Sequence, residues 1–214
     1  MMNKVLCSLL LFLSISCGLQ GRNANYARDS KRIWLDSKEI HHGEYVWKMK
    51  KAGDVISSAE KVSTLGYDTS DWLSAIVPGT VLNSLVYNKE YPEPYYGVNN
   101  KLESGKIPDI SKVGREFYTY WFRTEFDVPE SFAGKTIWLQ PDGVNYRAEI
   151  WVNGNLLSTL NGMFISDYIN VTDFVKVGRK NILAVKVYPV DVPGTTMPKS
   201  WGATGEFHNG GNGN

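Results

Sequence analysis

The sequence predicts an all-β sandwich, and three observations carry this prediction. Of the 214 residues, 43% are hydrophobic and 13% aromatic, which is enough to build a core and excludes a disordered chain. From Ile33 onward, Gly, Pro, Asn and Asp interrupt the chain about every ten residues. Between these breaks, several short segments alternate apolar and polar residues, as strands do.

The clearest strand is expected over 118–128. Its alternation predicts one buried face, while Trp121 falls on the other. The residues expected on the buried face are Tyr118, Tyr120, Phe122, Phe126 and Val128.

Three further strands are expected, over 137–139, 146–152 and 182–188. Asn153-Gly154 follows the second of these directly, and an Asn-Gly pair supplies the positive φ angles of a tight hairpin. Trp151, like Trp121, lies opposite the apolar stripe of its strand, and packing against a second layer is favoured over stacking on a ligand.

One short helix is expected over 80–88, closing an end of the sandwich. Thr80 is a suitable N-cap after Pro78-Gly79, and Val81, Leu82, Leu85 and Val86 form an apolar stripe.

The first 17 residues have the pattern of an export signal. Lys4 gives a positive start and a mostly apolar stretch follows, too short to span a membrane as a helix. Cys17 closes a segment that looks like a lipoprotein cleavage box, so we expect lipidation at Cys17. Cleavage after Gly18 by the ordinary peptidase is the alternative. Residues 18–31 are polar and are expected to act as a flexible tether in a bacterial periplasm or envelope.

The charge balance and the motif content exclude several functions. The chain has 23 Lys and Arg against 22 Asp and Glu, which argues against a nucleic-acid-binding groove. We find no nucleophile elbow, phosphate loop or zinc-protease motif, so no cofactor is expected. The three histidines, His41, His42 and His208, are not spaced for a metal site, so no metal is expected.

Five segments, in this order, carry a resemblance to a known family. They are Val77-Pro78-Gly79-Thr80-Val81-Leu82, Pro94-Tyr95-Tyr96-Gly97-Val98-Asn99, Tyr120-Trp121-Phe122-Arg123-Thr124-Glu125-Phe126, the run from Gly143 to Gly154, and Asn181-Ile182-Leu183-Ala184-Val185-Lys186-Val187. Together they resemble the amino-terminal domain of glycoside hydrolase family two, most closely the branch of exo-β-D-glucosaminidases and β-mannosidases.

This resemblance implies a galactose-binding-like jelly roll over 32–200, with 201–214 as a truncated Gly/Asn-rich loop. In the family the module packs beside an immunoglobulin-like domain and a catalytic barrel. The barrel supplies an acid/base Glu after an Asn and a nucleophilic Glu, and no Asn-Glu step occurs in these 214 residues. No catalytic residue is therefore assigned, and this chain alone is expected to be inactive.

The resemblance also suggests binding residues. Trp201 and Asn212 are candidates for lining a weak site for a β-linked glycan or amino sugar. Tyr95, Tyr96 and Asn99 are candidates for contact with the missing immunoglobulin-like and catalytic domains.

Two functional interpretations remain. The chain is either the non-catalytic module of an exported family-two exo-β-glycosidase or a stand-alone, envelope-tethered carbohydrate-binding module. An adhesin built on the same sandwich is a third, because fold does not fix function.

Overall fold

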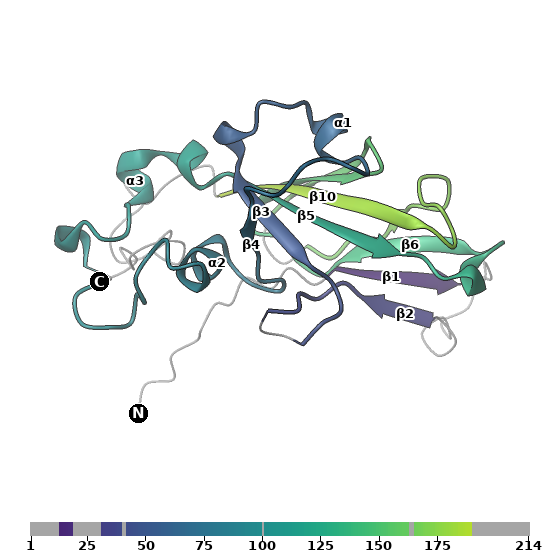
Figure 1. The fold of residues 1–214 in the computed structure, drawn as a ribbon, viewed down its shortest axis with the longest axis horizontal. Helices are drawn as coiled ribbons and strands as arrows, with labels where there is room; N and C mark the ends of the chain where they lie inside the picture. Colours follow the sequence, from purple (N-terminus) through teal and green to yellow (C-terminus); the bar gives the residue numbers. More distant parts are fainter. Residues whose placement is uncertain (1–12, 19–30, 40–41, 100, 163–164, 190–214) are drawn as a thin grey trace.

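The computed structural model describes residues 13–18, 31–39, 42–99, 101–162 and 165–189, and these form a sandwich of two antiparallel sheets (Figure 1). The four-stranded sheet has the order β2-β1-β6-β9, and the six-stranded sheet has the order β4-β3-β5-β10-β7-β8. The strands are β1 (Leu13–Gly18), β2 (Lys31–Trp34), β3 (Trp47–Lys51), β4 (Leu73–Ser74), β5 (Tyr120–Asp127), β6 (Thr136–Pro141), β7 (Arg147–Val152), β8 (Asn155–Asn161), β9 (Ile169–Asn170) and β10 (Lys180–Tyr188). The predicted β-sandwich is confirmed.

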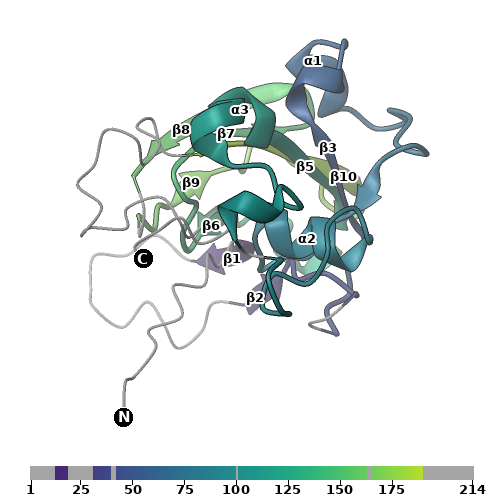
Figure 2. The ribbon, with the colours of Figure 1, turned by 90° about the vertical axis from the view of Figure 1, so that its left-hand side faces the viewer.

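The helices are short and lie in the connections between strands. They are α1 (Ala59–Val62), α2 (Val81–Tyr87) and α3 (Ile110–Val113), with 3-10 turns η1 (Ala52–Asp54), η2 (Leu102–Ser104), η3 (Arg115–Tyr118) and η4 (Glu130–Phe132). Helices α2 and α3 lie together at one end of the sandwich, which faces the viewer in Figure 2.

The main core lies between the two sheets. Phe122, Leu183 and Ile150 from the six-stranded sheet pack in one cluster with Ile137 and Leu139 from β6. All five are at most 3% exposed. Burial of these side chains is the main stabilising contribution, at about 25 cal/mol per Å² of apolar surface.

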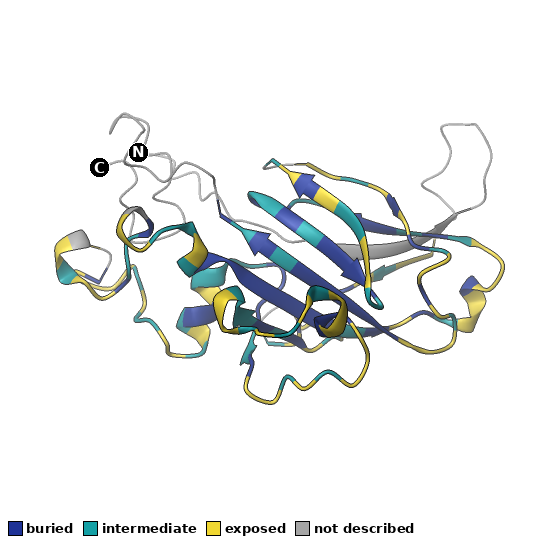
Figure 3. Cartoon of the chain, turned by 90° about the horizontal axis from the view of Figure 1, so that it is seen from above, coloured by how far each residue is buried: buried dark blue, intermediate teal, exposed yellow. Residues whose placement is uncertain are grey.

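The six-stranded sheet is buried on its outer face as well, where 52–72 crosses it. Trp121, Trp151 and Ala184 on that face pack in a second cluster with Val62 and Trp72 from the crossing segment. In Figure 3 the strands beneath this segment are mostly buried while the connecting loops are exposed. The expected packing of Trp121 and Trp151 is confirmed.

The four expected strands are present with small changes at their ends. Tyr118 belongs to η3 rather than to a strand, so β5 begins two residues later than expected, at Tyr120. Because 52–72 covers the outer face of the sheet, β5 is buried on both faces. The alternation of its sequence had predicted a single buried face. Asn153 and Gly154 have φ angles of 48° and 87° and join paired residues Val152 and Asn155, which confirms the predicted hairpin.

The expected helix is α2, capped as predicted. Thr80 Oγ1 accepts a hydrogen bond from Asn83 N at 2.9 Å. The helix ends at Tyr87, and the side chain of the next residue, Asn88, donates to Ser84 O and Ser74 O. These bonds attach α2 to β4 and hold it against the end of the sandwich.

The amino-terminal region contributes two strands. β1 contains Cys17 and most of its length falls inside the predicted export signal, while Lys31 at the end of the predicted tether begins β2. Export, the tether and lipidation at Cys17 stay predictions, because the position of β1 in the uncleaved chain does not test them.

Candidate functional site

The end of the sandwich beneath α2 and α3 brings together two of the sequence motifs. The segment before α2 is fixed by hydrogen bonds: Ser37 N donates to Val77 O at 2.7 Å, and Ile76 N donates to Ser84 Oγ at 3.0 Å. Gly79 is needed here because an added Cβ would lie 2.6 Å from Ile76 O. The motif at 77–82 is therefore held in one conformation.

Asn145 from the other motif lies beside this segment in a small cavity. The cavity has a volume of about 30 Å³ and is lined by Thr80, Val81, Leu82, Tyr118, Asn145, Val187 and Pro189. Asn145 is only 8% exposed, and its Oδ1 has no hydrogen-bond partner among the described residues. A buried acceptor of this kind is costly to leave unmatched, so the cavity suits one small donor group.

The same end holds tyrosines that stay neutral. Tyr118 OH donates to Pro108 O at 2.5 Å. Burial, and then the neighbouring Tyr91, raise the pKa of Tyr118. Burial likewise raises the pKa of Tyr120. None of the described residues that line the cavity is a carboxylate, so these residues can donate and accept hydrogen bonds but offer no pair of carboxylates for acid/base catalysis.

The loop after α2 presents two exposed aromatic side chains. Tyr95 and Tyr96 are 79% and 76% exposed. Asn99, by contrast, is buried: its Nδ2 donates to Glu93 O at 2.9 Å and its Oδ1 accepts from Lys106 Nζ at 2.8 Å. Asn99 thus shapes the loop that displays Tyr95 and Tyr96. The domain-contact role of these three residues stays a prediction.

A second, larger site lies at the opposite end of the β5–β10 pair. It is an open cleft of about 660 Å³, lined by Ile33, Lys38, Glu44, Tyr45, Val46, Lys48, Thr69, Arg123, Glu125, Asp127, Pro129 and Lys180. Burial, and then Glu44 and Asp127, raise the pKa of Tyr45, so its hydroxyl stays protonated in this cleft.

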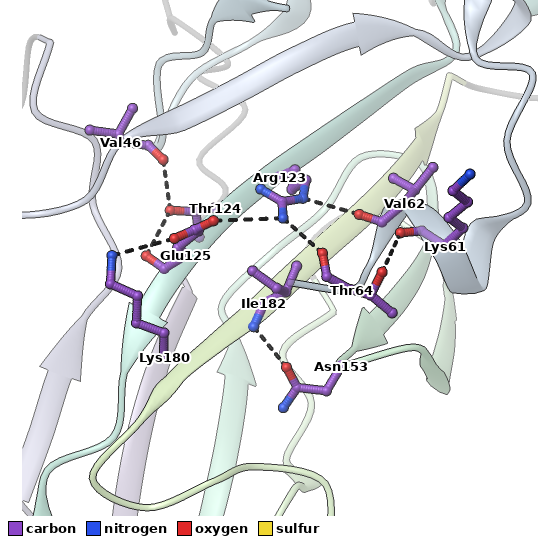
Figure 4. A network of polar contacts seen from close by, with 10 residues as sticks. All are labelled: Val46, Lys61, Val62, Thr64, Arg123, Thr124, Glu125, Asn153, Lys180 and Ile182. Carbon is purple, nitrogen blue, oxygen red and sulfur yellow. Dashed lines mark hydrogen bonds and ion pairs between the residues drawn. The ribbon is translucent and has the colours of Figure 1, made fainter. Parts of the chain in front are cut away.

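Arg123 lines the cleft and takes part in a network of polar contacts (Figure 4). Its Nε donates to Val62 O and one terminal nitrogen donates to Thr64 O, both at 3.0 Å, and the same nitrogen lies 3.8 Å from Glu125 Oε1. Lys180 Nζ lies 3.4 Å from the other oxygen of Glu125. Burial lowers the pKa of Arg123 and Glu125 opposes this shift.

The Arg123 contacts hold the crossing segment on the sheet. The sequence gives no signal that Arg123 is buried. Its two acceptors are backbone carbonyls about sixty residues away, and only the fold brings them near. The contacts of Arg123 and Glu125 in the cleft are therefore structural.

Two candidate sugar-binding residues, Trp201 and Asn212, lie outside the described residues, as do His41 and His208. Within the part of the chain that the structure describes, no group of three or more potential metal ligands occurs, and no helix is long and apolar enough to cross a membrane.

Comparison with known proteins gives one consistent result. Residues 47–201 match the family model for the galactose-binding domain-like domain of glycosyl hydrolase 2. The chain is 40% identical over 131 residues to a mannosylglycoprotein endo-β-mannosidase of Lilium longiflorum. This alignment covers 61% of this chain and 13% of that protein. The chain is 29% identical over 149 residues to an exo-β-D-glucosaminidase of Amycolatopsis orientalis, covering 68% of this chain and 13% of that protein.

A solved structure agrees. The exo-chitosanase of Amycolatopsis orientalis in complex with PNP-β-D-glucosamine superposes with a TM-score of 0.57 at 27% identity, over 69% of this chain and 16% of that one. The chain thus spans well under a fifth of the length of these relatives.

Proposed function

The chain belongs to the galactose-binding domain-like family of glycosyl hydrolase 2, and from this premise we propose that it is the non-catalytic amino-terminal module of an exported exo-β-glycosidase. The observation that carries the proposal is the family match over residues 47–201, together with the alignment to an exo-β-D-glucosaminidase. In the parent enzyme the proposed reaction is hydrolysis of a β-linked glycan or amino sugar.

The residues that line the two sites favour a non-catalytic role for this chain. Retaining hydrolysis needs two carboxylates about 5 Å apart, one of them kept protonated. Among the described residues, the cavity beside Asn145 is lined by no carboxylate. The cleft contains three carboxylates, Glu44, Glu125 and Asp127, and of these Glu125 is paired with Arg123 and Lys180. The end beneath α2, with Tyr95 and Tyr96 exposed beside it, is the proposed contact surface for the catalytic and immunoglobulin-like domains.

Activity and binding assays on the purified chain test this proposal. With chromogenic β-glucosaminides, mannosides and galactosides we expect no turnover above background. Titration with glucosamine or mannose, followed by Trp fluorescence, should give at most binding with a Kd of about 1 mM. Turnover that follows the protein peak through purification would overturn the proposal.

A stand-alone carbohydrate-binding module is the second candidate, and the candidate residues Trp201 and Asn212 motivate it. Against it, Trp121 and Trp151 are buried under 52–72 and offer no stacking platform on that sheet face. Micromolar binding that Trp201→Ala abolishes would favour this second candidate. Trp34→Ala, which changes an indole that is 46% exposed, is the matched control.

We also propose export to a bacterial periplasm or envelope, with a lipid anchor at Cys17. The positive and apolar residues of the first 17 positions support this proposal. Mass spectrometry of the protein from its host should find a lipid-modified amino terminus at Cys17. A free amino terminus at Leu19 would reject lipidation and retain export.

A further inference from the structure

Strand β1 is an interior strand of its sheet, although it lies at the amino-terminal end of the described chain. It pairs with β6 at six positions, from Leu13 with Pro141 to Gly18 with Thr136, and with β2 at four positions. Among the described strands β2 pairs only with β1 (Figure 1). β1 therefore fills a gap and joins β2 to the rest of the sandwich.

The directions of β2 and β6 determine the direction of the strand that lies between them. β1 is antiparallel to both neighbours, so β2 and β6 run in the same direction and leave space for one strand of opposite direction. A strand placed there has both backbone edges paired, which avoids two open edges in the sheet.

The neighbouring strands also favour an alternating sequence in the strand between them. Position 15 lies opposite Leu139 on one side and Ile33 on the other, and both of these side chains pack against the main core. Position 17 lies opposite Ile137, which is 1% exposed. Positions 15 and 17 thus lie in register with core residues of the neighbouring strands, and the sequence Leu-Ser-Ile-Ser-Cys-Gly has Ile and Cys at these two positions.

Both expected cleavage points lie within or at the end of this strand. Cleavage before Cys17 removes the first four residues of β1, and cleavage after Gly18 removes the strand completely. Either cut would leave β6 with an unpaired edge and β2 without its partner strand.

We propose that the gap between β2 and β6 is an acceptor site for a single apolar β-strand, and that Leu13–Gly18 occupies it for as long as the amino-terminal segment is present. Cleavage at Cys17 and a complete four-stranded sheet then exclude each other. The acceptor site rests on the pairing of β1 alone, while its consequence for processing rests on the export proposed above.

A cut in the connection between β1 and β2 tests the acceptor site in the full chain. A protease recognition sequence placed within residues 22–28 is cut after folding, and the product is separated by size under native conditions. We expect the amino-terminal fragment to stay with the remainder in equal amounts and to leave only in denaturant. Hydrogen exchange should show the β6 amides equally protected before and after the cut.

Substitutions at position 15 provide the specificity control. Ile15→Pro removes a backbone donor from an interior strand and should weaken retention of the fragment by roughly tenfold or more. Ile15→Val keeps both the donor and the apolar character and should retain it.

Native loss of the unsubstituted fragment from a folded, monomeric remainder would overturn the proposal. Loss of the fragment together with dimerisation of the remainder would also overturn the proposal that Leu13–Gly18 fills the gap. It would show instead that a second copy of the chain fills it. Neither outcome bears on the sugar titrations and activity assays, so failure here is distinguishable from failure of the proposed function.

Discussion

The side-chain amide of Asn153 donates a 2.7 Å hydrogen bond to Oδ1 of Asn181, which joins the tip of the β7–β8 hairpin to the start of β10. Asn153 Oδ1 also accepts from Ile182 N at 2.9 Å. Asn181 is fully buried, and its Nδ2 donates to Lys176 O and Arg179 O, both at 2.9 Å. Two amides thus fix two connections, the β7–β8 hairpin and the segment between β9 and β10, near one end of the six-stranded sheet.

Replacing Asn181 should destabilise the module strongly. Asn181→Leu leaves buried donors and acceptors unmatched, and we expect a loss of about 3 kcal/mol in the free energy of unfolding. Urea unfolding followed by Trp fluorescence measures this loss. Asn155→Ala, at an exposed residue on the same hairpin, should cost under about 1 kcal/mol, and equal effects of the two substitutions would contradict the argument.

Replacing Arg123 should detach the segment 52–72. Arg123→Ala removes the donors to Val62 O and Thr64 O, and we expect a loss of about 2 to 3 kcal/mol. Arg123→Lys should recover only part of it, because an ammonium group does not reproduce the guanidinium fork. Limited proteolysis between residues 55 and 70 should become faster in Arg123→Ala.

Lys180→Ala is the matched control for Arg123. It removes an exposed partner of the same carboxylate, Glu125, and should change the free energy of unfolding by at most about 1 kcal/mol. A large effect at Lys180 with none at Arg123 would show that the ion pair, and not the carbonyl bonds, holds this face.

Stability should fall at alkaline pH. Burial raises the pKa of Tyr118, Tyr120 and Tyr188 above the ordinary value near 10, with Glu149 adding to the shift at Tyr188. Above this pH the unfolded chain loses protons that the folded chain keeps, so the free energy of unfolding decreases as pH rises.

Thermal unfolding measured from about pH 8 to about pH 11 tests this decrease, because this interval spans the ordinary tyrosine pKa of about 10. The melting temperature should be nearly constant at first and drop above about pH 10. The drop should be smaller in Tyr188→Phe, which cannot ionise. A melting temperature that rises over this interval would contradict the assigned pKa directions.

Gly79→Ala should destabilise the segment before α2. The added Cβ would meet Ile76 O at 2.6 Å, a backbone atom that cannot move away alone. We expect a loss of about 1 to 3 kcal/mol, as for overpacking in a core. Gly53→Ala, where a Cβ meets nothing within 4 Å, should cost much less, and both can be compared by urea unfolding.

The elements predicted from sequence are those in which local patterns and packing agree. β5, β7 and β10 alternate clearly, and the Asn153-Gly154 hairpin and the Thr80 cap depend on chemistry within a few residues. For the outer face of the six-stranded sheet, the sequence favoured packing of Trp121 and Trp151 over exposure but did not identify the segment that covers them. The reason is that 52–72, which crosses this face, has no strong periodic pattern.

The candidate sites were less predictable because they depend on long-range contacts. The unmatched Oδ1 of Asn145 becomes evident only when α2 and β10 close around it. Asn99 illustrates the same limit: its position beside Tyr95 and Tyr96 predicts exposure, while its bonds to Glu93 and Lys106 place it inside the loop.

The pairing of β1 with β6 has a consequence for the timing of synthesis. Ser14 pairs with Gln140, which the ribosome adds roughly 6 to 25 s after Ser14 at about 5 to 20 residues per second. Throughout that interval β1 has no β6 with which to pair. In the export that we propose, β1 would still be accessible to the translocation machinery during this time, and slower elongation would favour processing over completion of the sheet.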